Sequence, residues 1–285
     1  MSDRDEHIVE AAGRCRVVIR NGRVVEVGTP QIQDCPLARR FACPVPEMTP
    51  EAIKRNIEGR IRSFGMCTPE REVLAGPDFV IFGASELLSS AVRRGDLDAA
   101  VIASDGAGTL VATNPSLIQG IGGRMSGLVK TSPIREVIAR IEENGGVVLD
   151  PATAAIDQTA GVALAAELGH RRIAVTTAVA AEAAAIRERF PGAVIVAVHM
   201  TGISREDAAL MARSADLLTA CASRHIREAA AKTALLQAGT SIPVFAMTAA
   251  GKAIILGKVA ETDQQIIVHG ARLPVPGSQS PSPLC

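Results

Sequence analysis

The sequence predicts an α/β protein with a mostly parallel sheet and helices on both faces, preceded by a small N-terminal lobe that contains a β-hairpin. From Phe79 onward, short β-branched segments alternate with longer alanine-rich segments, and such alternation of strand and helix forms parallel sheets through right-handed crossovers. Some strand segments, such as 194–198, are apolar at every position, which is typical of strands that helices cover on both faces. The 285 residues, 47% of them apolar, suffice for a large core.

Residues 1–75 are expected to form the lobe. Asn21-Gly22 lies between two segments rich in valine and isoleucine, and this dipeptide favours a type I′ turn because both of its residues accept a positive φ. The pattern predicts a hairpin over 15–27. A proline-rich irregular segment follows, and Pro50 opens a predicted helix whose isoleucines repeat along one face.

The rest of the chain is expected to form a parallel α/β domain over 76–270 and a disordered tail over 271–285, because the tail is rich in proline, serine and glycine. The predicted strands are 79–82, 98–103, 146–149, 172–176, 193–198, 216–220 and 242–246. The predicted helices are 84–94, 134–143, 158–168, 179–190, 204–213, 223–238 and 248–257.

The composition excludes some classes of partner. Lys plus Arg equals Asp plus Glu at 30 each, and Trp and Tyr are absent, whereas nucleic-acid binding favours a basic excess and stacking aromatic side chains. No apolar stretch approaches the roughly 20 residues that span a bilayer, and the polar N-terminus lacks the apolar segment of a signal peptide. We therefore expect a cytoplasmic protein without nucleic-acid or membrane partners. Its six cysteines are expected to be free thiols, because that compartment is reducing.

Residues that follow parallel strands gather at one edge of the sheet, where helix N-termini offer free N–H groups. The polar residues in such positions are Asp105, Asp150, Thr177, His199, Thr201, Cys221, Ser223 and Thr248. We expect the catalytic residues to be Asp105, His199 and Cys221. His199 suits acid–base catalysis because the unperturbed histidine pKa lies near neutral pH. Cys221 suits nucleophilic catalysis because a helix N-terminus stabilises a thiolate.

Two glycine-rich segments, 105–109 and 120–124, could bind an anion through their backbone N–H groups. Neither matches the dinucleotide fingerprint or the P-loop. The residues expected to bind substrate or anion are Gly106, Gly108, Thr109, Gly122, Gly123, Arg124, Thr201 and Ser223.

Each of these residues also has a structural interpretation. The glycines could simply form turns. Ser223, like Asp150, could cap a helix, and His199 could be a core histidine bonded to a carbonyl oxygen.

The cysteines leave two interpretations open. No Cys-x-x-Cys occurs, so the common zinc and ferredoxin spacings are absent and buried structural thiols are favoured. If the lobe folds over the strand ends, however, four thiols could surround one metal ion or cluster. The predicted ligands are then Cys15, Cys35, Cys67 and Cys221, and the predicted cofactor is a [4Fe-4S] cluster or another thiolate-bound metal.

Several motifs, in the same order over about residues 8–255, together resemble those of the methanogenesis marker protein 8 family (DUF2099). They are Gly13-Arg14-Cys15-Arg16-Val17, Cys35-Pro36-Leu37, Phe64-Gly65-Met66-Cys67-Thr68, Asp105-Gly106-Ala107-Gly108-Thr109, Gln119-Gly120-Ile121-Gly122-Gly123-Arg124, His199-Met200-Thr201-Gly202-Ile203-Ser204 and Thr219-Ala220-Cys221-Ala222-Ser223. The resemblance implies that Cys15, Cys35, Cys67 and Cys221 match the family's cysteines, whereas Cys43 and Cys285 are peculiar to this chain. It also implies a connection with methyl-coenzyme M metabolism.

Two functions are therefore expected as alternatives. The first is an enzyme of coenzyme M biosynthesis that binds a small sulfonate precursor and inserts or transfers sulfur at a cysteine-based site. The second is a non-catalytic accessory protein that carries an iron–sulfur cluster or metal for a methyl-coenzyme M enzyme. The expected partners are a small sulfonate-like anion and either a second copy of the chain or a partner enzyme.

Overall fold

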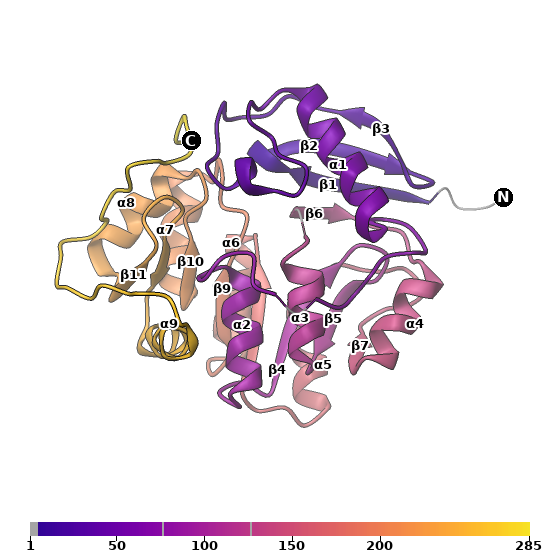
Figure 1. Cartoon of the computed structure of the whole chain (residues 1–285). Helices are drawn as coiled ribbons and strands as arrows, with labels where there is room; N and C mark the ends of the chain where they lie inside the picture. The colour runs from indigo at the N-terminus through magenta and orange to yellow at the C-terminus, as the bar shows by residue number, and fades with distance from the viewer. Residues whose placement is uncertain (1–4, 76, 126) are drawn as a thin grey trace.

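The computed structural model describes residues 5–75, 77–125 and 127–285. Figure 1 shows a small lobe seated above one end of a larger body in which helices cover a central sheet. Over the described residues the chain forms nine α-helices and two sheets. None of the helices in that part is long and apolar enough to cross a membrane.

The lobe is built on an antiparallel sheet with the strand order β3-β2-β1-β6. Its strands are β1 (Glu6–Ala11), β2 (Cys15–Arg20), β3 (Arg23–Val27) and β6 (Gly127–Lys130). The predicted hairpin is confirmed, since Asn21 and Gly22 both have positive φ between β2 and β3. Strand β6 comes from the middle of the chain and pairs with β1, so the sheet of the lobe includes a segment far from residues 1–75 in sequence.

Helix α1 (Pro50–Phe64) covers this sheet. Thr49 caps it by accepting a hydrogen bond from Ala52 N, and Gly65 ends it with a φ of 73°. Ile53 and Ile57 are buried on the face that packs on the lobe. The helix predicted from Pro50 is thus confirmed.

The larger sheet has the order β11-β12-β10-β9-β8-β4-β5-β7. Its strands are β4 (Ala99–Ser104), β5 (Gly108–Ala112), β7 (Gly146–Val148), β8 (Ile173–Thr177), β9 (Val194–Ala197), β10 (Leu217–Thr219), β11 (Leu236–Ala238) and β12 (Val244–Ala246). Neighbours β4–β8, β8–β9 and β9–β10 are parallel, and the other described pairs are antiparallel. The expectation of a mostly parallel sheet was wrong, because antiparallel strands flank the parallel centre on both sides: β5 and β7 beyond β4, and β12 and β11 beyond β10.

Helices cover both faces of this sheet, as predicted. One face carries α2 (Ala84–Arg93), α3 (Pro115–Gly122), α4 (Arg135–Glu143) and α9 (Ala249–Glu261). The other carries α5 (Gln158–Glu167), α6 (Ala180–Arg189), α7 (Arg205–Ser214) and α8 (Arg224–Thr233). Strand β4 alternates between the two cores, with Ile102 facing the first and Val101 the second.

Some elements differ from the prediction. The predicted strand 79–82 is irregular, and 236–238 forms β11 where the predicted helix 223–238 was expected to continue. Strand β12 runs opposite to β10, so Thr248 lies at the far edge of the sheet and donates to Asp216, which precedes β10. Thr248 therefore does not join the polar residues that follow the parallel strands.

A substitution at Gly120 tests how closely α3 packs against the backbone of Val73. A Cβ atom at this position would lie well inside van der Waals contact of the Val73 carbonyl oxygen. We expect Gly120→Ala to lower the free energy of unfolding by about 1–3 kcal/mol through overpacking. Gly192→Ala is the matched control, because a Cβ there meets no atom within 4 Å. Urea denaturation measures both, and equal midpoints for Gly120→Ala and the unmodified chain would contradict this close approach.

Candidate functional site

The three predicted catalytic residues lie at one edge of the larger sheet. Asp105 follows β4, His199 follows β9 and Cys221 follows β10. These strands are aligned in the same direction through β8. Adjacent strands are about 5 Å apart, so the ends of β4 and β9 lie roughly 10 Å from each other. The lobe covers this edge (Figure 1).

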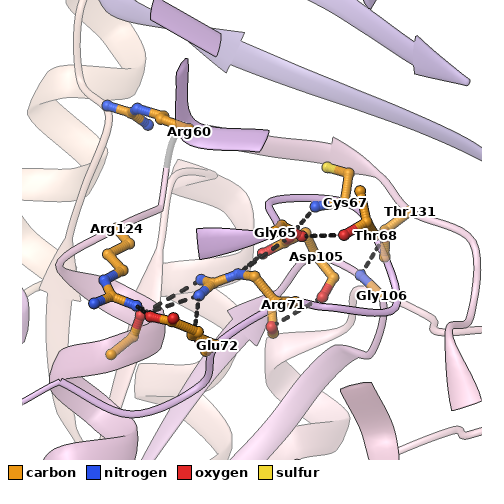
Figure 2. A network of polar contacts seen from close by, with 12 residues as sticks. Arg60, Gly65, Cys67, Thr68, Arg71, Glu72, Asp105, Gly106, Arg124 and Thr131 are labelled. Carbon is orange, nitrogen blue, oxygen red and sulfur yellow. Dashed lines mark hydrogen bonds and ion pairs between the residues drawn. The ribbon is translucent and has the colours of Figure 1, made fainter. Parts of the chain in front are cut away.

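Asp105 is held in a buried ion pair with Arg71 (Figure 2). Both side chains are almost completely buried, and Arg71 Nε lies 3.0 Å from Asp105 Oδ1. Cys67 N donates to Asp105 Oδ2 at 2.6 Å. Burial alone would raise the pKa of Asp105, but the Arg71 charge and these hydrogen bonds outweigh it and lower the pKa. Asp105 is therefore an ionised anchor for the lobe at neutral pH and a poor proton acceptor.

The remaining Arg71 donors are also satisfied. Its Nη1 donates to the carbonyl oxygens of Glu72 and Gly120, and its guanidinium lies 5.0 Å from the centre of the Phe64 ring. Arg60 lies nearby, and burial, together with the Arg71 charge, lowers the pKa of Arg60 to about 10. Arg71 could not be predicted as a site residue from the sequence, because a single arginine in an irregular segment carries no pattern.

A second buried chain of hydrogen bonds reaches the same turn. His7 Nε2 lies 2.7 Å from Asp5 Oδ1, and His7 Nδ1 lies 2.6 Å from Thr131 Oγ1. Thr131 Oγ1 in turn accepts from Gly106 N at 2.8 Å. His7 is completely buried on the inner face of β1, a strand that was not predicted from the sequence.

The glycine segments are engaged within the protein. Gly106 N is bonded to Thr131, Gly108 packs against the Ala154 carbonyl, and Thr109 Oγ1 donates to Gln158 Oε1 at 2.6 Å. Both glycines have positive φ, as the turn between β4 and β5 requires. In this arrangement the N–H of Gly106 already has a partner within the chain.

Gly122 and Gly123 lie at the carbonyl end of α3, where the helix dipole is negative and does not favour an anion. Arg124 follows them and forms an ion pair with Glu72 at 3.0 Å. Its guanidinium stacks 5.1 Å from the centre of the Phe64 ring, close to Arg71 (Figure 2). The anion-binding role expected for this segment stays a prediction.

His199 lies under the lobe. A Cβ built on Gly127 of β6 would be 3.5 Å from His199 Cγ and 3.1 Å from Glu10 Cβ, so the imidazole borders β6 and β1. The residue is exposed to solvent, and desolvation by the protein atoms packed around the ring lowers its pKa to about 4. The imidazole is therefore accessible and neutral at neutral pH.

Arg14 ties the lobe to the loop that carries His199. Its Nη1 donates to the carbonyl oxygens of Thr201 at 3.1 Å and Gly202 at 2.8 Å. Thr201 Oγ1 accepts a hydrogen bond from Ala222 N at 3.3 Å. Thr201 therefore joins this loop to the next one along the edge.

Cys221 occupies that next loop, before α8. Its side chain is half-buried, and Arg227 Nη2 donates to its carbonyl oxygen at 3.0 Å. Arg227 Nε is buried and has no hydrogen-bond partner among the described residues. Ser223 caps α8 by accepting from Ile226 N at 3.1 Å, as in the structural interpretation of this residue.

Three of the four predicted thiol ligands lie at the core of the lobe. Cys15 and Cys67 are completely buried there, and Cys35 packs against the same core, which also includes Ala222, the residue after Cys221. Burial raises the pKa of Cys15, Cys35 and, most strongly, Cys67. The charge of Cys221 adds to the rise at Cys35, which means that these two thiols lie within electrostatic reach of each other.

A protonated, buried thiol is a weak metal ligand until it loses its proton. Across residues 5–75, 77–125 and 127–285, no group of three or more His, Cys, Asp or Glu side chains is arranged to hold a metal ion. In this arrangement the cysteines form no ligand set for a metal or cluster, and the predicted cofactor stays a prediction.

Several residues with a left-handed backbone conformation lie at the junction between the lobe and the edge of the larger sheet. Arg14, Cys67, His199 and Cys221 all have positive φ without being glycine. Such a conformation costs about 1–3 kcal/mol per residue, persists only where the surroundings enforce it, and clusters at functional sites. Each of the four lies where the lobe meets the edge of the larger sheet, which marks this junction as the candidate site.

The Arg71–Asp105 pair is tested by Arg71→Met, with exposed Arg62→Met as the control. We expect Arg71→Met to lower the free energy of unfolding by about 3–5 kcal/mol, because Asp105 would remain buried without its partner. Because the folded-state pKa of Asp105 is lowered, the pair stabilises the protein above the unfolded-state value and loses this effect as pH falls. Acid titration followed by circular dichroism should show Arg71→Met unfolding at higher pH than Arg62→Met. Coincident acid transitions would contradict the role of this pair.

His199 is tested by NMR titration of histidine-labelled protein. We expect its ring to protonate near pH 4, well below the usual value of about 6.5. Since the unfolded state then binds more protons than the folded state, His199 should reduce stability as pH falls from about 6.5 to 4. His199→Gln should remove this part of the pH dependence. A titration midpoint near 6.5 would show that the lobe does not desolvate the imidazole.

Comparison with known proteins places the chain in a family. Residues 7–260 match the family described as "Uncharacterized protein conserved in archaea (DUF2099)". The chain is similar to "Uncharacterized protein MJ0054" of Methanocaldococcus jannaschii, with 44% identity over 283 residues that cover 98% of this chain and 99% of the relative. No solved structure matches it. With most of its length matched in both comparisons, the chain belongs to the archaeal conserved family DUF2099.

Proposed function

We propose that the protein is an enzyme of coenzyme M metabolism that transfers sulfur to a small sulfonate-like precursor at Cys221. One observation carries the proposal: the loops that bear His199 and Cys221 are adjacent beneath the lobe and joined by the hydrogen bond from Ala222 N to Thr201 Oγ1. A thiol and a neutral imidazole on adjacent loops supply a nucleophile and a proton acceptor. The metabolic setting comes from the resemblance to methanogenesis marker protein 8.

The surroundings of Cys221 support its role as the reactive thiol. It is half-buried, whereas Cys15 and Cys67 are sealed in the core. It lies in the loop just before Ser223, the N-cap of α8. Arg227 adds a positive charge beside it, and Arg227 Nε still has a hydrogen to donate. An anionic sulfonate oxygen is a suitable acceptor for that donor.

The proposed reaction begins with a persulfide on Cys221, supplied by a separate persulfide donor. Its terminal sulfur attacks the precursor carbon that carries a leaving group, so a carbon–sulfur bond forms and the leaving group departs with its electron pair. The Cys35 thiol then loses its proton to solvent and attacks the Cys221 sulfur of the mixed disulfide, which releases the product thiolate and joins Cys35 to Cys221. An external dithiol reduces this disulfide by two electrons before the next cycle.

The common core shared by Cys15, Cys35 and Cys67 beside the Cys221 loop supports a second candidate, a non-catalytic accessory protein that carries an iron–sulfur cluster or metal. Anaerobic purification with iron and sulfide analysis tests it. Stoichiometric iron and sulfide without turnover would favour this candidate over the enzyme. A cytoplasmic location, a small anionic ligand and a second copy or partner enzyme belong to both proposals.

Cys221→Ser tests the enzyme. We expect it to reduce formation of the thiol product by about 10³-fold or more, because a hydroxyl cannot carry the persulfide. The assay supplies two-carbon sulfonates, a persulfide donor and a dithiol under anaerobic conditions, and mass spectrometry measures the product.

Cys43→Ser is the matched control, because Cys43 lies outside the junction and its thiol donates to Arg55 O. It should leave turnover unchanged. Full turnover in Cys221→Ser would exclude this thiol as the sulfur carrier.

A further inference from the structure

Residues 282–285, called the strap here, return from the far end of the chain to the junction. On one side the strap bonds to the lobe: Ser282 N donates to Asp34 O at 3.0 Å, and Ser282 O accepts from Asp34 N at 3.0 Å and Gln33 N at 2.7 Å. These contacts form an antiparallel bridge between Ser282 and Asp34. The strap thus pairs with the residue that immediately precedes Cys35.

On the other side the strap bonds to the loop that carries Cys221. Cys285 N donates to Ala222 O at 2.8 Å, and Arg224 N donates to Cys285 O at 2.7 Å. Arg224 Nη2 also donates to Leu284 O at 3.3 Å. The partner Ala222 immediately follows Cys221, and Arg224 is the first residue of α8.

The strap therefore links the two segments that carry the coupled thiols. Its lobe contact is next to Cys35 and its sheet contact is next to Cys221, and these thiols lie within electrostatic reach of each other. Cys285 packs on the same core as Cys35, and its Sγ lies 3.5 Å from Gln31 O. Cys285 O accepts the hydrogen bond from Arg224 N, the first N–H of α8.

The strap is held mainly by backbone hydrogen bonds. Ser282 and Pro283 are exposed, and Leu284 and Cys285 are only partly buried. Segments with exposed hydrogen bonds and few buried apolar contacts open at low free energy, without unfolding of the core. The strap is thus poised to detach while the two sheets stay folded.

We propose that the strap is a closure over the Cys35–Cys221 pair, and that it must detach before a reactant reaches these thiols. This inference deepens the proposed function, because it concerns access to the same site. The proposal predicts that the strap shields Cys35 and Cys221 from solvent reagents in the intact chain.

Alkylation of individual thiols tests the strap. The reduced full chain and a variant that lacks residues 282–285 are exposed to iodoacetamide, and peptide mass spectrometry gives the rate at each cysteine. We expect Cys35 and Cys221 to react about tenfold faster or more in the shortened chain, because a closed segment limits reagent access to its open fraction. Cys43 should react at the same rate in both. Unchanged rates at Cys35 and Cys221 would overturn the proposal.

Cys15 and Cys67 report whether the shortened chain is folded, since both are completely buried. If they become alkylated, a full-length variant with Ser282→Pro and Cys285→Pro replaces it, because proline lacks the N–H groups that donate to Asp34 O and Ala222 O. The expectation for Cys35 and Cys221 is the same. Cys285→Ser keeps every backbone hydrogen bond of the strap and should leave both rates slow; faster labelling in that variant would overturn closure by the backbone. Closure would also be overturned if Cys221 were alkylated as fast as Cys43 in the full chain.

These measurements do not depend on turnover. If Cys221→Ser is inactive and removal of the strap leaves the labelling rates unchanged, the strap proposal is wrong and the proposed function stands. If removal of the strap speeds labelling and Cys221→Ser keeps full turnover, the proposed function is wrong and the strap proposal stands.

Discussion

The buried ion pair between Arg71 and Asp105 fixes how the lobe meets the larger sheet. Removing two charges from water costs several kcal/mol per ion, and only near-complete hydrogen bonding offsets this. Here the carboxylate accepts from Arg71 Nε and Cys67 N, and the remaining guanidinium donors reach carbonyl oxygens on both sides. Any shift of the lobe would break this set and leave a charge buried without a partner. The pair therefore fixes the position of the lobe over the strand ends.

That position accounts for the geometry of the junction. With the lobe fixed at Cys67, Arg14 reaches the carbonyl oxygens of Thr201 and Gly202, and β6 lies against His199. The hydrogen bonds from Arg14 and between Thr201 and Ala222 fix the loops after β9 and β10, which enforces left-handed backbone at His199 and Cys221. The strain is local, and the lobe packed above these loops compensates for it.

Much of this arrangement could be predicted from the sequence where local chemistry decides it. Asn21-Gly22 determines its hairpin, and the apolar segments that form β8 and β9 are recognisable because both their faces are buried. Antiparallel β5 and helix α3 were missed because their glycines resemble those of loops, although Gly108 and Gly120 are required for close backbone approach. β6 has only four residues and depends on pairing with β1, more than a hundred residues away. Such non-local pairing, like the partner of Asp105, leaves no periodic signal in the sequence.

The cysteines differ in how deeply their thiols are buried, and this limits which of them can react. Cys15 and Cys67 are sealed in the core, and their raised pKa values keep them protonated, so they act as small apolar side chains. Cys35 and Cys221 are half-buried, lie within electrostatic reach of each other, and come from the two bodies that the Arg71–Asp105 pair joins. A reaction at these thiols would therefore need a fixed junction and an opening to solvent at the same time. A closure made from a third, weakly held segment meets both needs, because the ion pair can stay intact while the thiols become accessible.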